Sequence, residues 1–318
     1  MGGPPAMTSR ADRVLARLME AYEQEELTQV DALATRLGTE HPGLWVWSAY
    51  IRAGVLALRG DPDAGLRLLA EADERGGWWS PPLLADPALA AIWPLDEAGI
   101  RARSELRWRA AQERAEVAWT VFRPPTRPAG VVISLHGNGP APADLFASLW
   151  AELGSCAAFL VRSPQLVAEN VYEWRDRDRA LADVRTVVRA ARAEYGSAIP
   201  MVLAGLGAGA RIAVEAALTG AVAVDGALAF APHMRPLTEK VMIGPRIRIF
   251  PGGTPESTAS CESFAVWARA QGIDCSLSYE EGMGHAFPER FHTTVSGVVA
   301  AVFDENPISA GEDSLAGS

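Results

Sequence analysis

The sequence has few of the features that mark a secreted, membrane-spanning or metal-binding chain. Its 318 residues include three cysteines, and none of them lies in a C-x-x-C pair or another metal-ligand spacing, so we expect no metal site and no disulfide framework. No run of about 18 apolar residues occurs, so no membrane-spanning helix is expected, and no apolar segment near the N-terminus resembles a secretion signal. Together with the odd number of cysteines, these absences predict a cytoplasmic protein.

Positively charged residues are also fewer than negatively charged ones. The chain has 29 lysine and arginine residues against 39 aspartate and glutamate residues, a formal net charge of −10 at pH 7, and Lys240 is its only lysine. An acidic chain repels nucleic acid and anionic membranes, so neither is expected as a partner. With 49% hydrophobic residues, the chain is long enough for one sizeable core and a second, smaller unit.

What the sequence does have is a glycine-rich turn at residues 205–209. An apolar run over 200–206 predicts a strand, and the run over 208–219 predicts a helix, which places Gly207 at the tip of a tight strand-to-helix turn. In a G-x-S-x-G turn of this kind, the central serine is an exposed nucleophile. Here that position is glycine, so the turn is expected without its hydroxyl group.

The same glycines also fit a dinucleotide-binding pattern. Gly205, Gly207 and Ala210 match G-x-G-x-x-G/A. That interpretation needs an acidic residue at the far end of the next strand, to bind a ribose hydroxyl, whereas the only acid of the next expected strand, Asp225, lies at its beginning. Two strand-like segments also precede the turn, although this pattern usually lies in the first strand–helix turn of its domain. We therefore expect neither a nicotinamide nor a flavin, and no other cofactor.

Two further segments flank the glycine-rich turn. Upstream, the apolar run over 131–136 ends in the His-Gly-Asn-Gly segment 136–139. Downstream, the Gly-Met-Gly-His segment 282–285 lies between an expected strand over 274–279 and an expected helix over 286–302. Each segment alone is a weak signal, but the three in this order and at these spacings favour one fold.

On these segments the chain resembles the α/β-hydrolase superfamily, on the branch of small carboxylesterases, phospholipase/carboxylesterases and serine aminopeptidase-like proteins. The resemblance implies an α/β-hydrolase-type fold with a doubly wound, mostly parallel sheet. It also implies an oxyanion hole made by the backbone N–H groups of Asn138 and Ala208. In the same comparison Gly207 takes the nucleophile position, and His285 takes the place of the catalytic histidine, which follows the nucleophile in the chain.

Four further residues are expected to shape the pocket. In the resembling proteins the histidine of the His-Gly segment orients its loop, and we expect this structural role for His136, beside Gly137 and Gly139. His233 follows the expected strand over 225–231, at the edge where open α/β sheets bind their ligands. It is expected either to line the pocket or to lie in an exposed turn.

The acid that orients the catalytic histidine is not evident. The resemblance places it after the expected strand over 246–250, in the stretch 252–256, where an aspartate would stand near Pro255. Glu256 is the nearest carboxylate, and it is the candidate partner of His285 if the loop register shifts by one residue.

The chain divides near residues 115–128. Residues 1–115 have helical periodicity and are expected to form an N-terminal α-helical extension, in which 45–69 resembles a single tetratricopeptide-type repeat that is completed by packing on the rest of the chain. Residues 116–305 are expected to form the α/β unit, and 306–318 a disordered tail. The helical extension is a candidate surface for a protein partner or for homo-oligomerisation.

Strands and helices are expected to alternate in the α/β unit, as a doubly wound sheet requires. The expected strands lie near 116–123, 131–136, 157–162, 200–206, 225–231, 246–251 and 274–279, and the expected helices near 142–153, 177–194, 208–219, 260–271 and 286–302.

Three functional hypotheses remain. In the first, the chain is an enzyme that uses His285 as a general base and the oxyanion hole for non-covalent chemistry on a carbonyl-containing or ester-like small molecule, as a cyclase, lyase, isomerase or water-mediated hydrolase. In the second, it is a degenerate hydrolase that binds a ligand or partner and catalyses nothing. In the third, it is a serine carboxylesterase whose nucleophile has been replaced by glycine.

Overall fold

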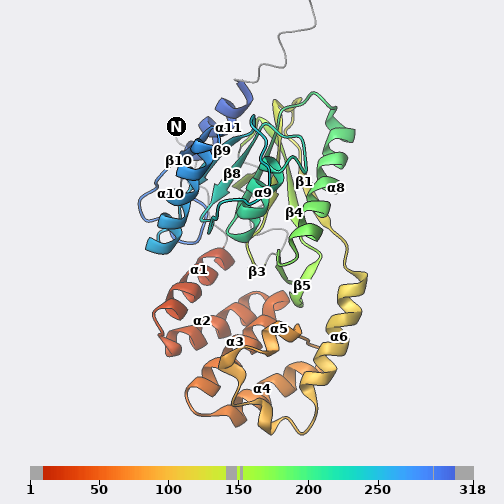
Figure 1. Ribbon diagram of the computed structural model, residues 1–318. Helices are drawn as coiled ribbons and strands as arrows, with labels where there is room; N and C mark the ends of the chain where they lie inside the picture. The colour runs from red at the N-terminus through yellow and green to blue at the C-terminus, as the bar shows by residue number, and fades with distance from the viewer. Residues whose placement is uncertain (1–9, 141–148, 151–152, 289, 305–318) are drawn as a thin grey trace, which may run out of the picture.

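The computed structural model describes residues 10–140, 149–150, 153–288 and 290–304 (Figure 1). The expected helix over 142–153 falls mostly outside the described residues, and the tail 306–318 falls wholly outside them.

The first part of the chain is mainly helical. α3 (Trp45–Leu58) and α4 (Pro62–Glu74) form a helical hairpin. Asp61 caps α4 by accepting a hydrogen bond from the N–H of Ala64 at 2.9 Å, and Pro62 takes the first helical position, where its missing N–H costs little. None of the helices that the structure describes is both long and apolar enough to cross a membrane. The other helices of this part are α1 (Arg10–Glu23), α2 (Leu27–Glu40), α5 (Pro81–Leu84) and α6 (Ile100–Arg114).

A seven-stranded sheet follows, in the order β1-β4-β2-β7-β8-β9-β10. The edge strand β1 pairs antiparallel with β4, and every other neighbouring pair is parallel. The predicted fold class, a mostly parallel α/β sheet after a helical extension, is confirmed. The strands are β1 (Ala118–Phe122), β2 (Gly130–Leu135), β4 (Cys156–Arg162), β7 (Met201–Leu206), β8 (Gly226–Phe230), β9 (Arg246–Phe250) and β10 (Cys275–Leu277).

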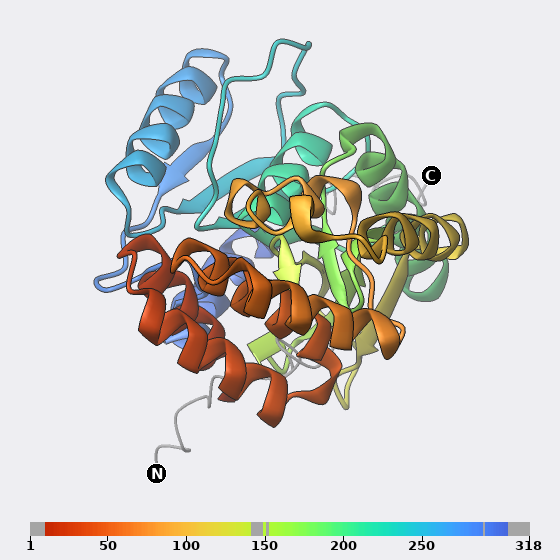
Figure 2. The ribbon, with the colours of Figure 1, turned by 90° about the horizontal axis from the view of Figure 1, so that it is seen from below.

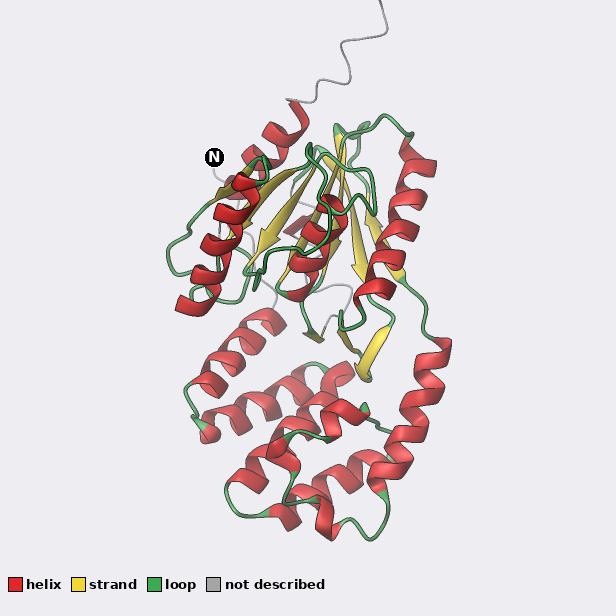
Figure 3. Ribbon diagram, viewed as in Figure 1, coloured by secondary structure: helices red, strands yellow, loops and turns green. Residues whose placement is uncertain are grey.

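Both faces of the sheet are covered (Figure 3), which explains why its central strands are continuous apolar runs. Successive residues of β2 alternate between two cores: Val131 and Ile133 belong to one, and Val132 belongs to the other. The first core is completed by α8 (Arg177–Tyr195), α9 (Ala208–Leu218) and α10 (Pro255–Ala270), and the second mainly by α11 (Phe291–Asp304).

Two of the expected helix boundaries are wrong. α10 begins at Pro255 rather than near 260, because Thr254 accepts a hydrogen bond from the N–H of Ser257 at 3.2 Å and caps the helix early. α11 begins at Phe291 rather than 286, because Pro288 lacks an N–H and restricts the residue before it. His285 therefore lies in a loop and does not head a helix.

A second, small sheet was not expected from the sequence. It has the order β3-β6-β5 and joins the helical part to the rest of the chain. Ala168 of β5 forms a bridge with Trp79, and the indole N–H of Trp108 donates to the carbonyl of Leu166 at 2.8 Å. The strands are β3 (Gly139–Pro140), β5 (Gln165–Ala168) and β6 (Val171–Glu173).

The helical part lies beyond the carboxyl ends of the parallel strands. Figure 1 shows α1 to α5 below the ends of the sheet, and Figure 2, seen from below, shows these helices in front of it. The helices therefore lie on the side of the sheet where α/β folds carry their ligand sites.

The start of α9 packs against the backbone of β2 without room for a side chain. A β-carbon on Gly209 would lie 2.2 Å from the carbonyl oxygen of His136, and one on Gly205 would lie 2.5 Å from the carbonyl carbon of Gly209. The two outer glycines of the turn are thus required by close backbone packing.

We expect Gly209→Ala to lower the free energy of unfolding by about 1–3 kcal/mol or more, because the methyl group would meet main-chain atoms that cannot move aside alone. Urea denaturation measures the change. Gly297→Ala is the matched control: Gly297 lies in α11, and a methyl group added there would have nothing within 4 Å, so alanine should raise stability by up to about 1 kcal/mol. Equal effects of the two substitutions would contradict the packing argument.

Candidate functional site

The turn between β7 and α9 has the strained backbone of a strand-to-helix elbow. Gly207 lies at φ +54° and ψ −115°, a combination that residues with a side chain rarely adopt. Its N–H donates to the carbonyl of Phe230 at 2.9 Å, and its carbonyl accepts from the N–H of Arg211 at 3.2 Å. The elbow is therefore fixed from β8 on one side and from the first turn of α9 on the other.

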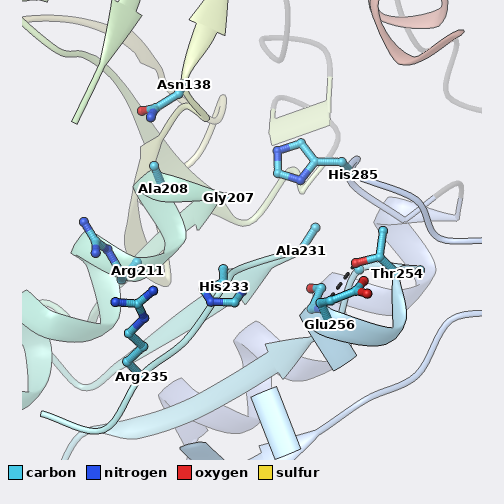
Figure 4. A pocket seen from close by; sticks show the side chains of 13 residues that line it. Asn138, Gly207, Ala208, Arg211, Ala231, His233, Arg235, Thr254, Glu256 and His285 are labelled. Atoms are coloured by element: carbon cyan, nitrogen blue, oxygen red, sulfur yellow. Dashed lines mark hydrogen bonds between the residues drawn. The ribbon is translucent and has the colours of Figure 1, made fainter. Parts of the chain in front are cut away.

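A cavity of about 500 Å³ opens at this elbow. It lies at the carboxyl edge of the sheet and takes its walls from the segments after β2, β7, β8, β9 and β10. It brings together six of the residues predicted from the sequence, which are Asn138, Gly207, Ala208, His233, Glu256 and His285 (Figure 4).

His285 lies directly over the elbow. Its ring atoms Cε1 and Nε2 are 2.8 and 2.9 Å from the point that a β-carbon on Gly207 would occupy. The imidazole thus fills the space where a serine side chain would begin.

The loop that carries His285 packs against the loop after β9. A β-carbon on Gly253 would lie 2.7 Å from the carbonyl oxygen of Met283, so the two loops touch through their backbones. Met283 and Phe287 on either side of the histidine are buried in the second core. These contacts seat an exposed histidine at a defined position over the elbow.

Glu256 lies in the first turn of α10, and its carboxylate is beside Thr254 rather than beside the imidazole of His285 (Figure 4). Its position follows from the early start of α10, which turns this side chain out from the helix end. The pairing of Glu256 with His285 stays a prediction.

His136 is buried and structural. Burial lowers its pKa to about 4, so the ring is neutral. Its Nε2 accepts from the N–H of Ser163 at 3.1 Å, which leaves the proton on Nδ1 to donate to the carbonyl of Gly137 at 2.5 Å. His136, Gly137 and Gly139 are not among the described residues that line the cavity, and their place in its wall stays a prediction.

These loop residues instead hold Asn138 in place. The ring of His136 packs against that of Trp174 with centroids 5.0 Å apart. The indole N–H of Trp174 donates to the carbonyl of His136 at 2.8 Å, and its backbone N–H donates to Oδ1 of Asn138 at 2.9 Å. One buried tryptophan therefore fixes both ends of the His-Gly-Asn segment.

Two arginines of the cavity were missed in the sequence. Arg211 comes from α9, four residues after Gly207, and Arg235 comes from the loop after β8, two residues after His233. The helical spacing of Arg211 from the elbow was a usable signal, because residues four apart lie on one helix face. No comparable sequence signal identifies the loop residue Arg235.

No protein-family model matches the chain, and no curated protein matches its sequence. Among solved structures it is similar to an uncharacterized protein from Bacillus cereus ATCC 10987, with 16% identity and a TM-score of 0.49 over 94% of this chain and 100% of the other. It is also similar to the Bacillus cereus carboxylesterase, with 19% identity and a TM-score of 0.49 over 61% of this chain and 99% of the other. Its similarity to Zea mays acyl-protein thioesterase 2 has 13% identity and a TM-score of 0.47 over 58% of this chain and 99% of the other. Likeness at this level does not assign an activity, which must be argued from the cavity.

The neutral, buried His136 should make stability depend on pH. Because its pKa is near 6.5 when exposed and about 4 in the fold, only the unfolded chain takes up this proton between these values. The free energy of unfolding should therefore fall as pH drops from about 6.5 to about 4, by up to about 1.4 kcal/mol per pH unit from this residue.

Urea denaturation between pH 7.5 and 4 measures that fall. His136→Gln should be less stable than the parent at pH 7.5, because it breaks the hydrogen bonds of the ring, but its stability should decline less steeply below pH 6.5. Parallel pH profiles of the two proteins would contradict the burial of a neutral His136.

Proposed function

We propose that the chain is an enzyme that acts on a carbonyl-containing small molecule without a covalent intermediate, with His285 as the general base. The observation that supports this most is the imidazole lying where a serine side chain would begin, with Nε2 at 2.9 Å from the point that a β-carbon on Gly207 would occupy. Since glycine has no hydroxyl to activate, a base at this place can act only on the ligand itself or on a water molecule.

The elbow also offers donors for negative charge on a carbonyl oxygen. Ala208 begins α9, so its backbone N–H has no partner within the helix. Asn138 lines the same cavity on a loop braced by Trp174. We assign the oxyanion hole to these two backbone N–H groups, and each such donor contributes roughly 10²–10³ in rate.

The proposed step is a proton transfer. Nε2 of His285 takes a proton from the carbon next to the carbonyl, and the C–H electron pair moves into the carbonyl to form an enolate whose oxygen is held by the two amides. Return of the proton to another carbon gives isomerisation. Attack of the enolate carbon on a second carbonyl of the same ligand, whose oxygen then takes the proton from His285, gives cyclisation. In aldol-type cleavage Nε2 takes the proton of a β-hydroxyl instead, and the electron pair of the breaking C–C bond forms the enolate. If Nε2 takes a proton from water instead, the hydroxide attacks the carbonyl carbon of an ester and the two amides hold the tetrahedral oxyanion. The C–O bond to the alcohol then breaks, and the leaving alkoxide takes the proton from His285.

Ligand binding without catalysis is the second candidate. The observation that favours it is the glycine at the tip of the elbow, since Gly207 lines the cavity without the hydroxyl that a serine hydrolase needs as its nucleophile. A serine carboxylesterase whose nucleophile has been replaced by glycine would have the same cavity.

His285→Ala should lower turnover about 10²–10⁴-fold, the contribution typical of a general base. Two probes measure it: hydrolysis of p-nitrophenyl acetate, and α-proton exchange of a small ketone in D₂O followed by NMR. His292→Ala, which removes an exposed histidine of α11 outside the cavity, should leave both rates unchanged. If His285→Ala matches the parent on both probes, the histidine is structural and binding becomes the better account.

Gly207→Ser tests the placement of the base independently. The parent should not react with a fluorophosphonate at the elbow, because it has no hydroxyl there. In the serine variant the imidazole must retreat by a few tenths of an ångström from a contact of 2.8 Å, and the hydroxyl then meets a base, so labelling should appear.

Gly207→Ala is the control for that variant, because it imposes the same backbone strain and the same contact without a nucleophile. It should remain unlabelled. A folded Gly207→Ser protein that also remains unlabelled would show that His285 is not poised as a base.

A further inference from the structure

One side of the cavity carries a concentration of positive charge that the proposed proton transfer does not use. Arg211 and Arg235 lie on the same side of it, with His233 next to them (Figure 4). Glu256 is the only acidic residue among the described residues that line the cavity, and it lies on the opposite side, beside Thr254. This local charge is opposite to that of the whole chain, which is −10.

Arg211 shares its ion-pair partner, Glu215, with Arg177. Arg211 and Glu215 are 3.7 Å apart at the closest atoms, whereas Arg177 donates from Nε to the same carboxylate at 2.6 Å. Glu215 is nearly buried, with 8% of its side chain exposed, so this shorter contact with Arg177 is the one that compensates its charge. Arg211 is left to face the cavity.

Arg235 has no compensation of this kind. Among the residues that the structure describes, it makes no hydrogen bond or ion pair, and its side chain is directed into the cavity beside Arg211 (Figure 4). Two guanidinium groups on one side repel each other, and a planar or tetrahedral oxyanion between them removes that repulsion and accepts paired N–H donors.

We infer that this side of the cavity binds the anionic group, a carboxylate or a phosphate, of a short ligand through Arg211 and Arg235. The inference rests on the proposed function for placing the reactive carbonyl between Gly207 and His285. It then identifies the substrate class as acidic carbonyl compounds. Arg211 lies one turn of α9 beyond the elbow, which is a distance of about 6 Å along the helix axis. The carbonyl and the anionic group of such a ligand are therefore a few bonds apart.

Isothermal titration calorimetry at pH 7 and low ionic strength tests the inference with three probes: succinate, inorganic phosphate, and succinamide as the neutral isostere of succinate. Succinate or phosphate should bind the parent, and succinamide should bind at least about tenfold more weakly, since hydrogen bonds to charged groups exceed neutral ones by this order. Tighter binding of succinate identifies a carboxylate as the anionic group, and tighter binding of phosphate identifies a phosphate.

Arg235→Gln should weaken binding of the preferred anion about tenfold or more, and it breaks no hydrogen bond or ion pair among the described residues. Arg211→Gln should do the same, with circular dichroism confirming its fold because it also touches Glu215. Lys240→Gln is the matched control: it removes one positive charge from the same loop after β8, outside the cavity, and should change affinity less than twofold.

Three results would overturn the inference: no binding of either anion at millimolar concentration, equal binding of succinamide, or affinities unchanged in both arginine variants. A different result would contradict the proposed function and leave the anion site standing. If His285→Ala leaves both turnover probes unchanged while succinate or phosphate still binds through the two arginines, the anion site stands and the general base does not.

Discussion

The approach of α9 to β2 is the constraint on which the rest of the site depends. The main chain at Gly209 comes so near the carbonyl oxygen of His136 that a single methyl group has no space, since its carbon would lie 2.2 Å from that oxygen. Because the helix cannot shift outward without losing this contact, the turn before it must close within one residue, at Gly207. That closure presents the first amide of α9 to the cavity and sets Arg211 one turn further along the same wall.

Much of this could be predicted from the sequence, because the elements concerned obey strong local rules. Parallel strands buried on both faces are continuous apolar runs, so the predicted ends of β2, β7 and β8 agree with the structure to within one residue. The Gly-x-Gly-x-Gly pattern predicted the elbow because its outer glycines have no substitute at such close packing. The order of segments placed His285 at the same edge, and the structure has it over Gly207.

Other features depend on forces that a linear pattern does not show. The sequence predicts a loop around Glu256, but the capping of α10 by Thr254 competes with that loop, and the helix forms instead. The small sheet was missed because strands of two to four residues are too short to show periodicity. The sequence around Arg235 is that of an ordinary exposed loop. Arg235 matters because the fold brings it to the same side of the cavity as Arg211, which belongs to another element. His136 is buried against Trp174 and is not among the described residues that line the cavity, and the sequence does not show this burial.

The Arg177 bridge gives the positive side of the cavity a further property. Arg177 donates to Glu215 of α9 at 2.6 Å and to Glu239 of the loop after β8 at 2.7 Å. The two elements that carry Arg211 and Arg235 are therefore tied together by an arginine that does not itself line the cavity. A binding surface whose framework is already ordered loses less conformational entropy when a ligand arrives, and this preorganisation raises affinity without any added contact. At the proposed anion site, the ion pairs of Arg177 would thus favour recognition through rigidity, without contact between Arg177 and the ligand.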